Sequence, residues 1–175
     1  MKFVDQTLPE SATLASHLQG MRIAMLSIRD SECRLVSQPM TPLEMDASGA
    51  IWLMISRSGR TASHVKANLP ADTLNLAFSD EGNSTYVSIT ARAMLSDDPQ
   101  RKQELWSTMA RPWFPDGADD TDLTLLCLEP TQAEIWDSPD NTVVRLLALA
   151  SSVVTGKPVD LGEHEELRNL DAHRV

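Results

Sequence analysis

The sequence predicts a mainly β domain, a six-stranded barrel with a few peripheral helices. Three observations predict this fold class. Short apolar or alternating segments recur along the chain, and turns rich in Asp, Ser, Asn and Gly separate them. Helical periodicity is confined to a few short runs. A length of 175 residues suits one domain that buries a full hydrophobic core.

The first third of the chain indicates one helix followed by a meander of three strands. The helix begins at Pro9 and ends at Gly20, with apolar residues at helical spacing between them. The predicted strands cover residues 21–28, 34–40 and 51–55, with an extended stretch over 42–45 and a turn at 46–49. Pro39 cannot donate a hydrogen bond to a neighbouring strand, which places the second strand at an edge or gives it a bulge.

The middle of the chain indicates two more helices and three more strands. One helix begins near Thr61 and runs to Asn68. The segment Asp97-Asp98-Pro99 starts the other, with proline in its first turn and acidic groups at its positive end. The strands cover residues 73–78, 85–95 and 123–136. Together with the first three they make six mostly antiparallel strands.

The composition of the chain changes at about residue 140. Residues 1–140 form the predicted barrel domain, and residues 141–175 form a tail of different character. The tail has a helical pattern over 141–154 and a charged stretch over 161–175. We expect this helical or extended tail to pack on the barrel or on a partner subunit.

Charge and composition exclude several classes of function. The net charge is −10, with 25 acidic and 15 basic residues, which disfavours binding to a nucleic-acid backbone. No run approaches the ~18 apolar residues of a membrane span, and the start of the chain lacks a signal-peptide pattern. Cys33 and Cys127 lack the spacing of a zinc or redox site, so both are predicted to be small buried residues. We therefore expect a cytoplasmic protein without a membrane or nucleic-acid partner.

A proline-bounded loop carries an aromatic residue ahead of the last long strand. Pro112 and Pro115 flank Trp113 and keep both helix and strand from running through it. Such a loop either seals one end of a barrel as a core plug or presents its aromatic ring to a ligand. The local sequence is consistent with both alternatives.

The polar turn over residues 56–61 is the candidate anion site. It lies between a wholly apolar strand and the start of a helix, and its residues are Ser56, Arg57, Ser58, Gly59, Arg60 and Thr61. Arginine side chains match phosphate oxygens, and free N–H groups at a helix start bind anions. The alternative is an ordinary polar turn whose hydroxyl group caps the helix.

Several motifs resemble a known family. They are Leu105-Trp106, Trp113-Phe114-Pro115 with Gly117 and Asp122, a Leu-rich strand, and Glu134-Ile135-Trp136-Asp137. Together they resemble the general stress protein branch of the pyridoxamine-phosphate-oxidase-like split barrels, over about residues 14–137. The resemblance implies a six-stranded split β-barrel of the FMN-binding type. It also implies a homodimer with the flavin between the two protomers.

The resemblance also indicates which residues contact FMN. The family's Arg-Pro-Met motif falls on Gln38-Pro39-Met40, and the end of its Trp-Phe strand falls on Ile55-Ser56. Its phosphate-binding segment falls on residues 58–61, or slightly later around His64. The implied FMN-contacting residues are Gln38, Pro39, Met40, Ile55, Ser56, Arg57, Ser58, Arg60, Thr61, His64 and Trp113.

Two departures from the family pattern affect the phosphate. Gln38 replaces the usual arginine, and the usual lysine is replaced by Thr61 in one register or by His64 in the other. These changes weaken FMN binding, retune it, or abolish it in favour of another anion. Arg60 is the nearest remaining cation, and its fork geometry differs from that of a lysine.

The implied function is that of an FMN-binding, stress-related protein that acts as a flavin-dependent oxidoreductase. No catalytic residue can be assigned, and the chain shows neither a metal-ligand spacing nor a Ser-His-Asp order. Two alternatives belong to other classes. One is a non-catalytic module that sequesters flavin, and the other is a barrel without cofactor that serves as an interaction protein.

Overall fold

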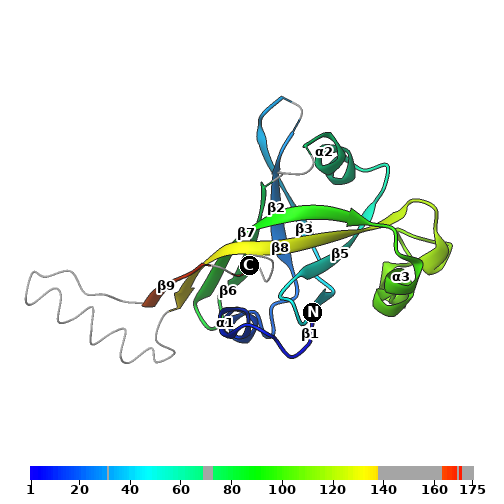
Figure 1. Cartoon of the computed structure of the whole chain (residues 1–175). Helices are drawn as coiled ribbons and strands as arrows, with labels where there is room; N and C mark the ends of the chain where they lie inside the picture. The colour runs from blue at the N-terminus through cyan, green and yellow to red at the C-terminus, as the bar shows by residue number, and fades with distance from the viewer. Residues whose placement is uncertain (31, 69–72, 138–162, 169, 171–175) are drawn as a thin grey trace, which may run out of the picture.

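A single curved sheet organises the chain, and short helices lie around its periphery (Figure 1). The computed structural model describes residues 1–30, 32–68, 73–137, 163–168 and 170. Its strands are β1 (Lys2–Phe3), β2 (Ala24–Arg29), β3 (Leu35–Met40), β4 (Glu44–Met45), β5 (Ile51–Ser56), β6 (Thr73–Asp80), β7 (Thr85–Ser96), β8 (Leu123–Asp137) and β9 (Glu163–Arg168). Its helices are α1 (Pro9–His17), α2 (Arg60–Asn68) and α3 (Pro99–Leu105), with the 3₁₀ turns η1 (Thr108–Ala110) and η2 (Gly117–Asp119).

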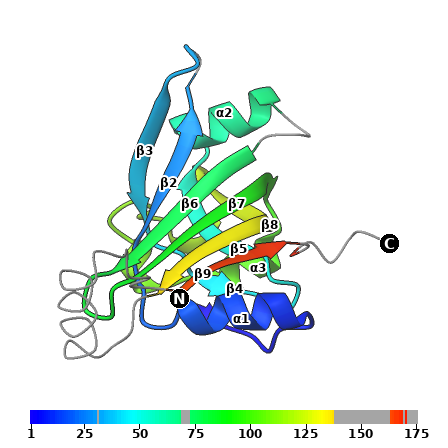
Figure 2. The same cartoon turned by 90° about the vertical axis from the view of Figure 1, so that its left-hand side faces the viewer.

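Strand β8 is the central element of the sheet. The strand order is β1-β4-β5-β8-β7-β6-β2-β3, and β9 also pairs with β8. One edge of β8 pairs with β7 from Leu125 to Trp136. The other edge pairs first with β5 and then with β9, as Figure 2 shows. The 15 residues of β8 therefore connect strands from the start, the middle and the end of the chain.

Alternation along the strands decides which face is buried. In β2, the side chains of Ala24, Leu26 and Ile28 are buried, while Met25 is exposed. The same alternation runs through β5 and β7, and the inward residues form one core with α1 and α2. Each fully buried leucine stabilises the fold by about 1.5–3 kcal/mol. The outward face of β2, β6 and β7 is left uncovered within the described chain.

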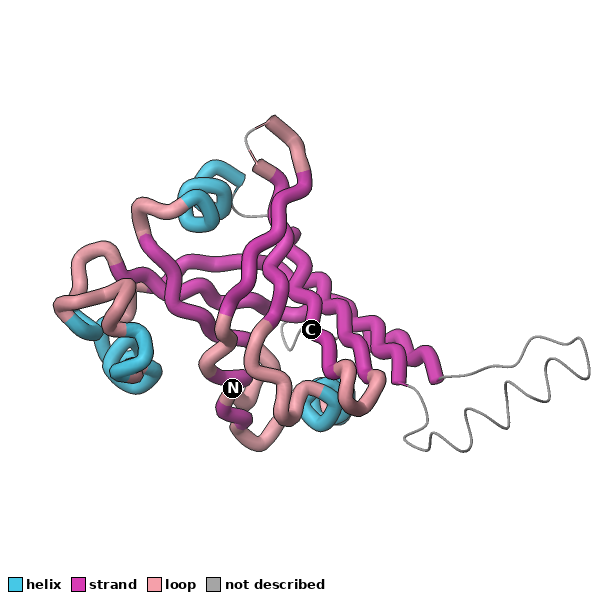
Figure 3. The backbone as a smooth tube through the Cα atoms, turned by 180° about the vertical axis from the view of Figure 1, so that it is seen from behind, coloured by secondary structure: helices cyan, strands magenta, loops and turns pink. Residues whose placement is uncertain are grey.

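The helices occupy separate places around the sheet (Figure 3). Helix α2 packs against β2, β5 and β7 through Ala62 and Val65, which are fully buried. Helix α3 begins as predicted: Asp98 is its N-cap and accepts hydrogen bonds from the backbone N–H groups of Gln100 and Arg101. None of the helices in the described ranges is long and apolar enough to cross a membrane.

The prediction of a mainly β chain with few helices is confirmed. The sheet has nine strands where the sequence predicted six, and within the described residues it does not close. Strands β1, β4 and β9 are the additional ones. Helix α1 ends at His17 instead of continuing to Gly20, which has a positive φ of 85°. The helix predicted over 141–154 lies outside the described residues.

One prediction about a single side chain is wrong, and one of two alternatives for another is excluded. Cys33 is exposed in the β2–β3 turn, where its φ is 60°, whereas Cys127 is buried as predicted. The turn projects away from the core, because Glu32 and Arg34 on either side of Cys33 are exposed as well. Trp113 is 73% exposed, which excludes the core-plug alternative. Phe114, the next residue, is buried in its place.

Candidate functional site

The edge strand β3 meets helix α2 through a contact between two predicted site residues. The side-chain amide of Gln38 donates a hydrogen bond to the Thr61 hydroxyl at 2.8 Å, and it lies 3.6 Å from the sulfur of Met40. Gln38 pairs with Leu26 across the ladder, so its side chain lies on the inner face of the sheet. Thr61 is buried, whereas Pro39 points to solvent. The structure therefore brings Gln38 and Met40 of β3 together with Thr61 in the first turn of α2.

A carboxylate of the chain itself fills the 56–61 turn. Asp122 accepts a hydrogen bond from the Ser56 hydroxyl at 2.5 Å and another from the Ser58 backbone N–H at 2.8 Å. These hydrogen bonds, the one from Ser56 first, lower the pKa of Asp122. Two of the donors that the sequence offered to an external anion are thus engaged inside the chain.

Arg57 is also engaged within the chain. Its guanidinium donates two hydrogen bonds to the carboxylate of Asp97, at 2.7 and 2.6 Å, and a third to the Thr121 carbonyl at 3.1 Å. The hydrogen bond with Asp97 is the main cause of the raised pKa of Arg57. This bidentate geometry fixes the turn to the start of α3 and to the start of β8. Arg57 therefore joins segments of the chain to one another, and its guanidinium is occupied within the chain.

Lys102 completes the cluster from helix α3. Its ammonium group is buried, donates to the Leu123 carbonyl at 2.7 Å and lies 3.5 Å from Asp97. The Thr124 hydroxyl donates to the same Asp97 carboxylate at 2.8 Å. Two cations, Arg57 and Lys102, therefore face two anions, Asp97 and Asp122. The cluster has no net charge left for an external ligand.

The other predicted site residues lie around this cluster. Arg60 is exposed and has no hydrogen bond or ion pair with any residue that the structure describes. His64 is half-buried on α2, and Ile55 is buried at the end of β5. Trp113 lies in the loop between η1 and η2, and its side chain makes no hydrogen bond within the described ranges. Its proposed contact with a ligand stays a prediction.

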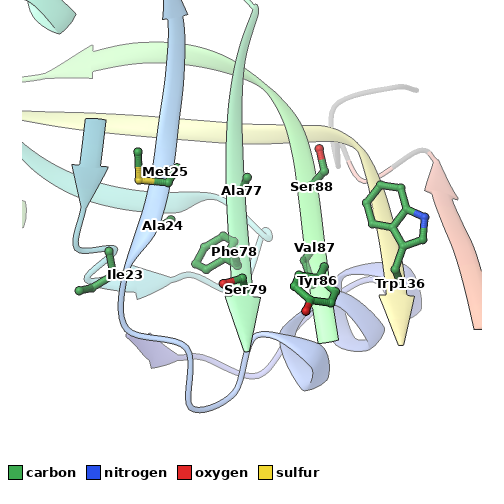
Figure 4. Close-up of a pocket in the computed structure, with 10 residues that line it drawn as sticks. All are labelled: Ile23, Ala24, Met25, Ala77, Phe78, Ser79, Tyr86, Val87, Ser88 and Trp136. Atoms are coloured by element: carbon green, nitrogen blue, oxygen red, sulfur yellow. The ribbon is translucent and has the colours of Figure 1, made fainter. Parts of the chain in front are cut away.

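A second candidate site lies on the outer face of the sheet. It is an open pocket of about 470 Å³, a volume within the range of small-molecule sites. Figure 4 shows Met25, Tyr86 and Trp136 around it, each from a different strand. Tyr86 and Trp136 are direct partners across the β7–β8 ladder. None of the residues that the sequence assigned to FMN lines this pocket.

An aromatic pair forms one rim of the outer-face pocket. The rings of Trp136 and His164 stack, with centroids 5.2 Å apart and an angle of 13° between their planes. His164 also lies 3.7 Å from the Glu134 carboxylate. Strand β9 thus borders the pocket on the far side of β8.

Sequence reasoning missed the partners of the 56–61 turn and most of the outer-face pocket. Asp97 is 40 residues from Arg57 in the chain, and no local pattern indicates their contact. A weak signal existed for the pocket, because Tyr86 is the only tyrosine and Met25 breaks the polar outer face of β2. No three His, Cys, Asp or Glu side chains in the described ranges are arranged to hold a metal ion.

The sheet, its peripheral helices and the polar turn between β5 and α2 define a protein of the pyridoxamine 5'-phosphate oxidase-like class. The chain belongs to that family, whose model matches residues 10–160.

Relatives within the family carry stress-protein names. General stress protein 26 of Bacillus subtilis is 28% identical over 97 residues, which are 55% of this chain and 68% of that protein. A crystal structure of a candidate general stress protein 26 from Jannaschia sp. CCS1 is 29% identical, with a TM-score of 0.68 over 90% of this chain and 99% of the other. The general stress FMN/FAD binding protein of Xanthomonas citri shares the fold at 24% identity, with a TM-score of 0.61 over 73% of this chain and 87% of the other.

Proposed function

We propose that the protein is a stress-related flavin-binding protein and that FMN binds where β3 meets α2. One observation carries the proposal: Gln38 on β3 contacts both Met40 on the same strand and Thr61 on α2, and the resemblance assigned all three to FMN. The general stress FMN/FAD binding protein of Xanthomonas citri, which has the same fold, supports it.

The side chains at this place match one part of a flavin nucleotide. Met40 offers apolar contacts to a ring, and the Gln38 amide and Thr61 hydroxyl offer hydrogen bonds to ribityl hydroxyl groups. A bound flavin would supply the electron-transfer chemistry, and the protein would hold and orient it. The phosphate finds fewer partners, because the donors of Ser56 and Ser58 are engaged by Asp122.

The uncovered outer face supports the second part of the proposal, a homodimer. Ile23 is 62% exposed, and Met25, Tyr86 and Trp136 are between 41% and 44% exposed. Exposed apolar groups that lie together on one surface are typical of an interface. A second copy of the chain would cover this face.

A titration with FMN tests the flavin site directly. We expect saturable quenching of flavin and tryptophan fluorescence at micromolar FMN. Met40→Ala removes sulfur contacts worth about 1 kcal/mol and is expected to weaken binding about fivefold. Met94→Ala is the matched control, because Met94 is an exposed methionine on β7. An equal loss in both variants, or no saturation by FMN, would contradict the site.

One observation favours a second candidate function. Gln38 and Thr61 satisfy each other, and Asp122 satisfies the 56–61 turn, so this end of the fold is complete without a ligand. A family member that acts as an interaction protein would fit that arrangement, and it would show no response to FMN. If FMN binds, consumption of NAD(P)H by the loaded protein separates an oxidoreductase from a flavin-sequestering module.

A further inference from the structure

We propose that the flavin site does not recognise the 5'-phosphate, so that riboflavin binds as tightly as FMN. This inference rests on the proposed flavin binding. It concerns which part of the ligand the chain recognises. It follows from how few positively charged groups remain unpaired among the described residues assigned to FMN.

Two cations at the 56–61 turn, Arg57 and Lys102, are already neutralised. Both carboxylate oxygens of Asp97 accept from Arg57, and Lys102 lies against the same carboxylate. A phosphate that took Arg57 from Asp97 would leave that carboxylate without its main partner. Replacing the Asp97 carboxylate by a phosphate as the partner of Arg57 therefore contributes little free energy to binding.

Two donors of the turn that leads into α2 are engaged as well. A helix start binds phosphate through free backbone N–H groups. Here the N–H of Ser58 and the hydroxyl of Ser56 both donate to Asp122. A dianionic phosphate at this place would also meet the negative charge of that carboxylate, which repels it.

The contact between Gln38 and Thr61 is uncharged. Thr61 is only 4% exposed, and its hydroxyl already accepts from the Gln38 amide. A phosphate placed there would lose its hydration without a countercharge, which is strongly unfavourable. Hydroxyl groups of a ribityl chain can exchange hydrogen bonds with the same two side chains at little cost.

Arg60 is the remaining cation among the residues assigned to FMN. Its side chain is exposed at the first position of α2 and has no ion-pair partner within the described chain. An exposed ion pair changes affinity by about fivefold at most. We therefore expect the dissociation constants for FMN and riboflavin to agree within about fivefold.

Isothermal titration with FMN and with riboflavin tests the inference on the full chain. The wild type should bind both flavins with similar affinity, and its affinity for FMN should be insensitive to salt. Thr61→Lys should favour FMN over riboflavin by at least about tenfold, because it creates a charge-assisted hydrogen bond. Gln38→Arg, at a half-buried position of the edge strand, should also favour FMN over riboflavin by at least about tenfold. This second variant keeps the test valid if Thr61→Lys fails to fold. Ser63→Lys, on an exposed position of the same helix, is the matched control and should leave the ratio unchanged.

The outcomes separate the two proposals. If the wild type binds FMN more than about tenfold tighter than riboflavin, this inference is wrong and flavin binding stands. A cation contributed by a second copy of the chain would give that result. If the wild type binds neither flavin, the proposed function fails and the inference fails with it.

Discussion

Asp97 holds three segments of the chain together through a single carboxylate. It accepts hydrogen bonds from Arg57 on the 56–61 turn and from Thr124 on β8, and it lies beside Lys102 on α3. The hydrogen bonds from Arg57 outweigh the opposing effect of burial, and the one from Thr124 adds to them. They lower the pKa of Asp97 from 3.8 to about 2.

This lowered pKa predicts a dependence of stability on pH. The folded state binds the proton of Asp97 less readily than the unfolded state does. The carboxylate therefore stabilises the fold above the ordinary pKa of 3.8, and this contribution is lost as the pH falls towards about 2. Because the side chain is 52% exposed, solvent screening limits the contribution to about 1 kcal/mol.

Denaturant unfolding of the wild type and of Asp97→Asn, from about pH 2 to about pH 7, measures this contribution. The variant should be less stable at neutral pH, and the difference should shrink steadily below about pH 4. Asp116→Asn, a change at an exposed acid, is the matched control. A difference that stays constant down to the lowest pH would rule out Asp97 as its source.

The sequence predicted the residues of the turn better than their roles. Arg57 and Ser58 were recognisable because two cations and three hydroxyl groups between an apolar strand and a helix are unusual. What they bind could not be predicted, because Asp122 and Asp97 reach them through the tertiary fold. A polar turn that binds an external anion and one that binds its own carboxylate have the same local sequence.

Strand β9 shows why a charged segment can be missed as an element of a sheet. Five of its six residues are His, Glu or Arg, so no alternating pattern is visible. The exception, Leu167, pairs with Ala133 and is only 7% exposed. Leu170, just beyond the strand, is 1% exposed. These two leucines, with the ladder to β8, fix a segment that composition alone would leave in solvent.

Leu167→Ala tests how much β9 contributes to the fold. The change removes core contacts and should lower the free energy of unfolding by about 2–4 kcal/mol. Glu165→Ala is the matched control on the same strand, because Glu165 is exposed. Thermal unfolding followed by circular dichroism measures both. Equal melting temperatures for the two variants would mean that β9 adds nothing to the stability of the sheet.

Helix α3 is positioned by a buried ion pair that spacing along the chain could not reveal. Arg101 donates to the Glu44 carboxylate at 2.8 Å and lies 4.7 Å from the ring of Trp52. Burial alone would raise the pKa of Glu44, but hydrogen bonds from Lys2 and Arg101 lower it. Strands β1 and β4 are two residues each, too short to show any periodicity. They bring Lys2 and Glu44 to α3.

At the scale of the whole molecule, the outer face of the sheet exposes large apolar side chains that no other described part of the chain covers. Alternation of apolar and polar residues predicted most strands correctly, because burial on one face imposes a period of two. The same rule cannot explain Met25, Tyr86 and Trp136, which point outward and remain exposed. Their exposure in a single copy is the reason for proposing a homodimer.

Sedimentation of the wild type and of two charge variants tests the proposed homodimer. The wild type should sediment at twice the 19.3 kDa of one chain. Met25→Lys places a charge in the outer-face pocket and should weaken association by at least about tenfold. Met109→Lys is the matched control, because Met109 is 82% exposed on η1, away from that pocket. A monomeric wild type, or equal behaviour of all three proteins, would rule out this face as the interface.

The margins of the sheet limit how copies of the molecule can join. Strand β3 is an end strand of the sheet and carries Pro39, which has no N–H to offer a further strand. At the other end, β1 is two residues long, and β9 consists mostly of charged residues. These features block the addition of strand upon strand, the route by which open-ended fibrils grow. Contact through the outer face, in contrast, uses up the same surface on both copies and is complete at two.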